Sequence, residues 1–263
     1  MADPADGPTG WPDLPSPPPW SELTRRPIAL FLDVDGTLVE FERRPEHVRA
    51  TEGLVLLLIE VAERLGGALA LISGRPLSDL DRIFAPWKPY AAGVHGVQVR
   101  GPEGLRNHHP DPAQLALLRL RADQVAQLLP GVWVEDKGVG VALHHRDAPD
   151  AAHALAVQVQ SIVEQSRGTF EAQPGVLVQE IRPSGWDKGA AVRELMESPP
   201  FSGRRPVVVG DDLTDEHAFA AALSLGGTAV LVGSRRATAA DSRLDSPSDV
   251  RGWLAELVEE VRS

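Results

Sequence analysis

The sequence predicts an α/β protein in which a Rossmann-like, doubly wound parallel sheet carries an inserted α+β domain. Short apolar runs that end in Gly or Asp alternate with helical patterns in residues 27–100 and again in residues 183–263. This alternation is typical of βαβ units, which form parallel sheets with helices on both faces. Residues 101–182 follow a different pattern. A chain of 263 residues with 43% hydrophobic content is long enough for one large domain or two modest ones.

Residues 1–26 form a predicted N-terminal arm. They are rich in Pro, Gly, Ser and Asp, a composition that favours an extended, flexible segment. Trp11 and Trp20 are the exceptions. Either they pin the arm to the folded domain or they are incidental aromatics on a flexible extension, and the sequence leaves both interpretations open.

The first stretch of the core is predicted to run strand, helix, strand, helix. The strands are short apolar runs, and the helices repeat apolar residues at helical spacing. The segments are, in order, IALFLD at 28–33, LVLLLIEVAERL at 54–65, ALALISG at 68–74 and LSDLDRIF at 77–84.

The middle stretch, residues 101–182, is predicted to form two helices and four strands in the order αββαββ. The helices lie near 113–129 and 151–166, and the strands are VWVED at 132–136, GVALHHR at 140–146, TFEAQ at 169–173 and VLVQEI at 176–181. Hairpin-forming strands with two helices indicate an antiparallel sheet covered on one face. We therefore expect a small domain inserted into the larger one.

The alternation of helices and strands resumes from residue 183 and completes the predicted core. Its segments are DKGAAVRELME at 187–197, PVVVGDD at 206–212, DEHAFAAAL at 215–223, TAVLVG at 228–233 and a final helix near 250–261.

Two carboxylates, Asp33 and Asp35, follow the first predicted strand. Ligand sites in open α/β sheets lie at the carboxyl ends of strands. Gly36 can adopt a turn that other residues resist, and Thr37 adds a hydroxyl and a backbone N–H, so this loop can wrap an anion. Taken alone, the two carboxylates are also compatible with an ordinary turn at the end of a strand, closed by the Asp side chains.

Complementary side chains follow at three further strand ends or helix starts. They are Ser73, Gly74 and Arg75 after the second strand, Lys188 at the start of a helix, and Gly210, Asp211 and Asp212 after a later strand. Phosphoryl transfer needs such groups, because donors and cations bind the phosphate oxygens and carboxylates bind a hard cation. The alternative for Lys188 is a surface lysine in a first helical turn. The alternative for Asp215 and Glu216, which follow Thr214, is that acidic residues suit the N-terminus of a helix.

These four motifs resemble those of the haloacid dehalogenase superfamily of phosphohydrolases. The resemblance implies that Asp33 attacks phosphorus, and that Asp35 protonates the departing sugar oxygen and then activates water. It also implies catalytic roles for Ser73 and Lys188, which would hold the phosphoryl group.

The same resemblance implies a Mg²⁺ cofactor. The ion would be held by the Asp33 side chain, the Asp35 backbone carbonyl and Asp211. Asp212 or Asp215 would either bind a metal-bound water or orient the other ligands.

The middle stretch resembles the cap that some members of this superfamily place over the active site. Four polar segments limit the resemblance to one family within this superfamily. They are GVHG at 93–96, EDKG at 135–138, ALHHR at 142–146 and VQEIRP at 178–183. Together with SGWDKG and GDDLTDE they resemble the trehalose-6-phosphate phosphatases, and the match covers nearly everything from Pro27 onward. The resemblance implies hydrolysis of trehalose 6-phosphate, the last step of trehalose biosynthesis, and functional pairing with a trehalose-6-phosphate synthase.

The resemblance also implies which residues bind the substrate. Glu135, Lys137 and Glu180 would bind the glucose ring that lacks phosphate, with Arg146 assisting. The alternative for the charged residues on neighbouring strands is a cross-strand ion pair on a solvated sheet face. The full expected set is Gly36, Thr37, Gly74, Arg75, His95, Glu135, Lys137, Arg146 and Glu180. His145 departs from the family, which commonly has an aromatic residue at that position.

Composition excludes several other classes. The net charge of −11 argues against nucleic acid as a partner, since Lys and Arg bind phosphate backbones. The chain has no Cys, and it shows no HExxH, Walker A or helix-opening GxGxxG motif. Because it has neither a signal sequence nor an apolar run long enough to span a bilayer, we expect a cytoplasmic protein without membrane contact.

Two rival functions remain at this point. Another capped sugar phosphatase, acting on sucrose 6-phosphate or mannosyl-3-phosphoglycerate, would share the four motifs and differ in the cap. A catalytically silent regulatory subunit that only binds sugar phosphate belongs to a different class. The presence of both Asp33 and Asp35 argues against that subunit.

Overall fold

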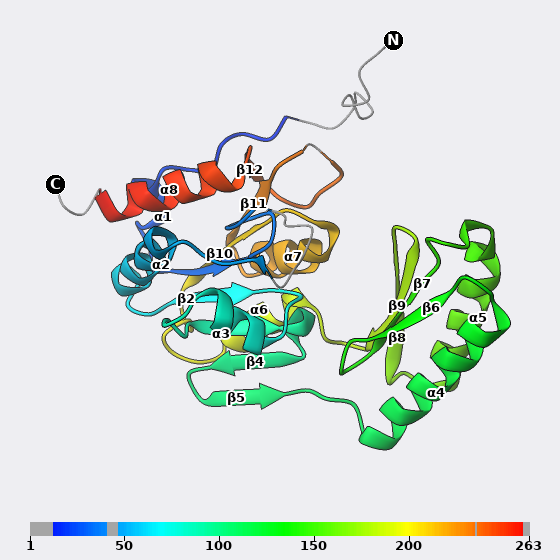
Figure 1. The fold of residues 1–263 in the computed structure, drawn as a ribbon. Helices are drawn as coiled ribbons and strands as arrows, with labels where there is room; N and C mark the ends of the chain where they lie inside the picture. Colours follow the sequence, from blue (N-terminus) through cyan, green and yellow to red (C-terminus); the bar gives the residue numbers. More distant parts are fainter. Residues whose placement is uncertain (1–12, 41–46, 235, 260–263) are drawn as a thin grey trace, which may run out of the picture. The chain divides into compact units, whose positions relative to one another are not determined.

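The apolar runs of the two outer stretches build the central strands of an eight-stranded sheet (Figure 1). The computed structural model describes residues 13–40, 47–234 and 236–259 and divides into two compact units. Unit 1 consists of the described residues up to Arg106 and from Asp187 onward, and unit 2 is Asn107–Trp186. The strands of the large sheet are β1 (Ile28–Leu32), β2 (Leu69–Ile72), β3 (Tyr90–Gly93), β4 (Gln98–Gly101), β5 (Gly104–Asn107), β10 (Arg205–Gly210), β11 (Thr228–Val232) and β12 (Ser242–Leu244).

The strands follow the order β12-β11-β10-β1-β2-β3-β4-β5. Those from β12 to β3 are parallel, which confirms the α/β class, whereas β4 runs antiparallel to β3. The large sheet is therefore mixed: it is parallel from β12 to β3, as expected, and has an antiparallel strand, β4, that the sequence analysis did not include. The cause is the short η2 (Val94–Gly96) between β3 and β4, because a parallel return would need a much longer crossover.

The central strand, β1, is buried along its whole length and has β2 and β10 as its neighbours. The chain leaves β1 toward β2, and it later leaves β10 toward β11 on the other side. Because the two connections diverge, the loops after β1 and β10 separate and leave a crevice at the carboxyl ends of these strands. The topology thus predicts where a ligand binds to unit 1.

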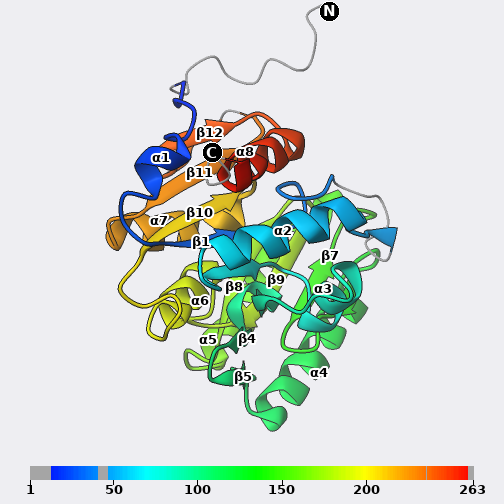
Figure 2. The ribbon, with the colours of Figure 1, turned by 90° about the vertical axis from the view of Figure 1, so that its left-hand side faces the viewer.

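Helices cover both faces of the large sheet. α2 packs against α8, and α6 packs against α7. The two pairs lie on opposite faces of the sheet (Figure 2), because the right-handed connections after β1 and β10 run in opposite directions along it. None of the helices within residues 13–40, 47–234 and 236–259 is both long and apolar enough to cross a bilayer. The helices of unit 1 are α1 (Trp20–Leu23), α2 (Glu52–Arg64), α3 (Leu77–Ile83), α6 (Lys188–Leu195), α7 (Glu216–Ser224) and α8 (Pro247–Glu259). The expected final helix near 250–261 corresponds to α8. Residues 260 and 261 of the expected range lie outside the described residues.

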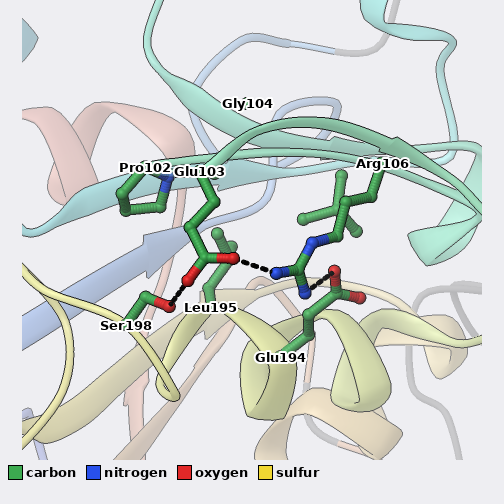
Figure 3. Close-up of a pocket in the computed structure, with 9 residues that line it drawn as sticks. Pro102, Glu103, Gly104, Arg106, Glu194, Leu195 and Ser198 are labelled. Atoms are coloured by element: carbon green, nitrogen blue, oxygen red, sulfur yellow. Dashed lines mark hydrogen bonds and ion pairs between the residues drawn. The ribbon is translucent and has the colours of Figure 1, made fainter.

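The hairpin of β4 and β5 extends unit 1 beyond the boundary expected at residue 101. Arg106 forms ion pairs with Glu103 and with Glu194 on α6, and the Ser198 hydroxyl donates to Glu103 (Figure 3). These contacts join the end of β5 to α6. The boundary between the two units therefore lies between Arg106 and Asn107. The sequence places the boundary earlier because β5 is exposed throughout and carries no apolar run.

Unit 2 is a four-stranded antiparallel sheet with two helices. Its elements are, in chain order, α4 (Pro112–Leu128), β6 (Trp133–Asp136), β7 (Val141–His144), α5 (Ala152–Gln165), β8 (Phe170–Gly175) and β9 (Val178–Pro183). The strands follow the order β6-β7-β9-β8. One sheet face packs Val141, Leu143 and Ile181 against the apolar residues of α4 and α5, and the other face is mainly polar. Alternating side chains on antiparallel strands produce this division.

The second half of the N-terminal arm is anchored to unit 1. Trp20 is fully buried, its ring stacks on Trp253 of α8 with centroids 3.9 Å apart, and its Nε1 donates to the Trp253 carbonyl. The backbone N–H of Arg243 donates to the Pro15 carbonyl at 2.8 Å. Trp20 therefore pins the arm, whereas Trp11 lies outside the described residues.

Replacing Trp20 by Ala should lower the free energy of unfolding by about 3–5 kcal/mol, because a large buried ring leaves a cavity and its partner loses a stacking surface. Urea-induced unfolding measures the change. Leu128→Ala is the control, since Leu128 is 70% exposed and its loss should cost less than about 0.5 kcal/mol. Equal stability of Trp20→Ala and wild type would show that the arm contributes nothing to the fold.

Candidate active site

Asp33 directly follows β1 and lies at the crevice between β1 and β10. Its backbone N–H donates to the Val209 carbonyl of β10 at 2.9 Å, so the ladder between the two strands continues into the loop. Only 5% of Asp33 is exposed. A carboxylate held by the sheet in this way has little freedom to move.

Lys188 connects two of the buried carboxylates. Its Nζ lies 2.7 Å from Oδ1 of Asp33 and 2.7 Å from Oδ1 of Asp215, and Lys188 is 3% exposed. As the first residue of α6 it places a cation where the helix dipole disfavours one. Burial by itself lowers the pKa of Lys188, but Asp33 and Asp215 outweigh burial and raise that pKa above its ordinary value. Lys188 therefore stays charged.

Asp215 shapes the loop after β10. Its Oδ2 accepts hydrogen bonds from the backbone N–H groups of Asp211 and Asp212, each at 3.1 Å, while its Oδ1 binds Lys188. Gly210 permits this approach, because a Cβ there would lie 2.3 Å from the Asp215 carboxyl carbon. Both oxygens of Asp215 are thus engaged, which suits an orienting role.

Three carboxylates crowd this end of the sheet. Oxygens of Asp33, Asp211 and Asp215 lie within 4.8 Å of one another. Burial raises the pKa of Asp33 to about 7 despite the opposing charge of Lys188, and burial together with repulsion from Asp215 raises the pKa of Asp211 to about 6. One ammonium group faces three carboxylates, so the cluster fits a hard divalent cation with oxygen ligands.

Asp33 and Asp211 are the side chains best placed to hold such a cation. The Thr37 hydroxyl donates to Oδ1 of Asp211 at 3.1 Å and orients that carboxylate. The structure does not bring the Asp212 side chain into the cluster. Asp212 is exposed, and its carboxylate accepts hydrogen bonds from the backbone N–H and hydroxyl of Thr214 at 2.7 and 2.6 Å.

Asp35 is held by Arg75. The guanidinium Nε and Nη2 donate to the two oxygens of Asp35 at 2.6 and 2.7 Å, a bidentate pair. Gly36 has a φ of 81°, which turns the chain directly after Asp35. Arg75 was expected among the substrate-binding residues, and in this structure it binds the carboxylate of Asp35.

Ser73 and His95 lie beside each other at the carboxyl ends of β2 and β3. Ser73 is buried, and its hydroxyl accepts from the Arg75 N–H at 3.1 Å. The His95 ring covers Gly74, since a Cβ on Gly74 would lie 2.7 Å from that ring. His95 has a φ of 52°, a left-handed backbone that sequence reasoning missed. The only signals in the sequence are the glycines on either side of Val94 and His95.

The polar face of the unit 2 sheet brings together three of the four residues expected to bind the sugar. Oε1 of Glu135 lies 2.7 Å from the Lys137 ammonium. Glu135 and Glu180 are both in register with Ala142 and therefore lie on the same face. Burial alone would raise the pKa of Glu135, but hydrogen bonds from Lys137 and His144 lower it. Arg146 lies in the exposed turn after β7.

Comparison with known proteins identifies relatives of the chain. A family model described as trehalose-phosphatase matches residues 31–248, which include both groups of residues described above. The chain is 38% identical over 232 residues to the probable trehalose-phosphate phosphatase of Sinorhizobium fredii, with 87% of each chain covered. It is 40% identical over 228 residues to the trehalose-6-phosphate phosphatase of Escherichia coli, with 86% of this chain and 85% of that protein covered.

A solved structure shares the fold. The trehalose-6-phosphate phosphatase of Aspergillus fumigatus superposes with a TM-score of 0.75 and 24% identity, covering 94% of this chain and 99% of the other. At that identity the likeness concerns the fold alone.

Proposed function

Since this chain belongs to the trehalose-phosphatase family, we propose that it hydrolyses trehalose 6-phosphate to trehalose and phosphate through an aspartyl phosphate on Asp33. As a member of that family it is a phosphoric monoester hydrolase. The observation that carries the mechanism is Asp33 itself, which is buried at the crevice between β1 and β10 and bound by Lys188 at 2.7 Å. Burial, fixed geometry and a nearby cation are what an attacking carboxylate requires.

In the first half of the reaction, a carboxylate oxygen of Asp33 bonds to phosphorus while the bond between phosphorus and the sugar oxygen breaks. Asp35 gives its proton to that departing oxygen. Lys188 binds Oδ1 of Asp33 and would reduce repulsion between the carboxylate and the phosphate. Ser73 lies at the carboxyl end of β2 and would donate its hydroxyl to a phosphate oxygen.

In the second half, Asp35 takes a proton from water as the water oxygen bonds to phosphorus. The bond between phosphorus and Asp33 breaks, so that phosphate leaves and the carboxylate returns. Asp33, Asp211 and the Asp35 carbonyl would hold Mg²⁺, which when bound neutralises charge on the carboxylates and the phosphoryl oxygens. Asp215 keeps the loop after β10 in place.

The pair between Arg75 and Asp35 must open before Asp35 can reach the sugar oxygen. Both oxygens of Asp35 are occupied by the guanidinium. We propose that phosphate draws Arg75 away, since Arg binds a phosphate dianion in the same bidentate way as a carboxylate. Substrate arrival would thus free the Asp35 carboxylate, which takes up a proton from solvent before it acts as the acid.

We propose that unit 2 is the cap of αββαββ type and that its polar sheet face binds the glucose ring without phosphate. The row that contains Glu135 and Glu180, with Lys137 beside it, supports this role. Such groups select a sugar because the wrong ligand would leave them unpaired. We further propose that the enzyme acts in the cytoplasm, with a trehalose-6-phosphate synthase supplying its substrate.

One assay tests the function directly. Phosphate release with Mg²⁺ should be compared for trehalose 6-phosphate, sucrose 6-phosphate, mannosyl-3-phosphoglycerate and glucose 6-phosphate. We expect the highest kcat/KM for trehalose 6-phosphate. A higher value for sucrose 6-phosphate or mannosyl-3-phosphoglycerate would assign the chain to another sugar phosphate, and no release from any substrate would favour a binding role.

Single Ala replacements of Glu135, Lys137 or Glu180 should reduce kcat/KM for trehalose 6-phosphate by about tenfold to a thousandfold, the range for losing one or two polar contacts. Glucose 6-phosphate lacks the second ring, so its slow hydrolysis should change far less. The melting temperature should scarcely move, because exposed ion pairs contribute little.

Asp136→Ala is the matched control for these variants. Asp136 is also an acidic residue of β6, but its side chain pairs with Arg119 of α4 at 2.9 Å. This variant should retain kcat/KM for both substrates. Equal losses on both substrates in the Glu135, Lys137 and Glu180 variants would contradict the assignment of the sugar face.

A further inference from the structure

We propose that Trp133 is a specificity-determining residue that stacks on the glucose ring without phosphate, with His144 as its support. Trp133 is the first residue of β6 in unit 2 (Figure 1). It is 48% exposed, whereas Trp20 and Trp253 in unit 1 are buried. Trp combines a large apolar ring face with a polar N–H group, and for this reason it is enriched at binding interfaces.

The Trp133 ring is held in a fixed orientation. It stacks on the His144 ring with centroids 3.9 Å apart and planes 10° apart. Trp133 and His144 are direct cross-strand partners of β6 and β7, so the backbone register itself brings the rings together. A ring that is already ordered loses little conformational entropy when a ligand binds.

The stacked rings are joined to the polar residues assigned to the sugar. Nε2 of His144 lies 2.9 Å from Oε2 of Glu135, and Oε1 of the same carboxylate binds Lys137 at 2.7 Å. Trp133 and Glu135 are two residues apart on one strand, and therefore they project from the same sheet face. An aromatic ring, a carboxylate and an ammonium group thus form one continuous surface.

This combination matches a pyranose ring. A glucose ring has an apolar C–H surface that suits an indole face, and hydroxyls around its edge that suit charged donors and acceptors. An apolar protein partner would instead need a contiguous apolar patch, and the neighbours of Trp133 on this face are His144 and Glu135. The surroundings of the indole therefore favour a sugar.

The inference rests on the proposed function, because only a substrate with a second sugar ring would reach Trp133. We expect Trp133→Leu to reduce kcat/KM for trehalose 6-phosphate by about threefold to tenfold, mainly through KM, the range for losing an aromatic contact. Trp133→Phe should keep most of the activity because it retains a stacking face. Both variants should hydrolyse glucose 6-phosphate like the wild type.

A second measurement reports contact without catalysis. Trehalose, which lacks phosphate, should change the intrinsic tryptophan fluorescence of the wild type, and that change should be absent from Trp133→Phe. A residue that only braced His144 would not give this signal. The inference is overturned if the wild type hydrolyses trehalose 6-phosphate while Trp133→Leu matches it, or loses equal activity on both substrates. A wild type without activity on trehalose 6-phosphate would instead overturn the proposed function, and the fluorescence change would then decide about the sugar contact.

Discussion

The Asp33→Asn variant should release phosphate from trehalose 6-phosphate at least several orders of magnitude more slowly than the wild type, because an amide cannot form the acyl phosphate. The fold should persist. Asn keeps an oxygen that can accept the hydrogen bond from Lys188, and it removes one of three crowded carboxylates. The melting temperature of the metal-free variant should therefore equal or exceed that of the wild type.

Two measurements check this expectation. Steady-state phosphate release gives the loss of activity, and mass spectrometry of acid-quenched protein should show a phosphorylated peptide containing Asp33 in the wild type and none in the variant. Asp245→Asn, at an exposed position that pairs with Arg243, serves as the control for an Asp-to-Asn change. Substantial residual activity in Asp33→Asn, with deamidation excluded by mass, would rule out covalent catalysis by this residue.

Removal of metal should abolish turnover, and Mg²⁺ should restore it, whereas Ca²⁺ should not. Asp33, Asp211 and Asp215 gather oxygen ligands without any nitrogen or sulfur donor, and the larger, looser coordination of Ca²⁺ disturbs in-line attack. Activity after EDTA treatment and dialysis, followed by titration with each ion, measures the effect. Full activity of the metal-free protein would refute the proposed cofactor.

Binding of Mg²⁺ can also be followed without catalysis. An ion that binds only the folded protein stabilises it, by about 2.7 kcal/mol at a hundred times its Kd. The melting temperature of the wild type should therefore rise with Mg²⁺. In Asp211→Asn the rise should shrink or vanish, while Asp245→Asn should respond like the wild type.

The sequence was sufficient to predict the class of fold and the strands that build the centre of the sheet. β1, β2, β10 and β11 are apolar runs, and burial on both faces of a parallel sheet demands such runs. Because parallel strands all end at one edge, the residues after β1, β2 and β10 could be grouped from the amino-acid sequence alone. The local sequence pattern was therefore enough to predict strands that are buried along nearly their whole length.

Features that depend on side-chain direction could not be predicted. The pair between Arg75 and Asp35 joins residues 40 positions apart, and the sequence is equally compatible with Arg75 on phosphate. The stack of Trp133 on His144 depends on the register of β6 and β7. The edge strand β5 and its neighbour β4 lack a continuous apolar pattern, because this side of the sheet is only partly buried.

The pairing of β1 with β10 determines the order in which the newly made chain can fold. β1 is synthesised early, yet one of its two neighbours in the sheet, β10, begins only at Arg205. Unit 2 is one uninterrupted segment, Asn107–Trp186, and can collapse as soon as it leaves the ribosome. The strand that presents Asp33 must wait for the last third of the chain to close the sheet around it. A nascent or truncated chain that ends before β10 therefore carries Asp33 without Asp211 and Asp215, the other two carboxylates of its cluster.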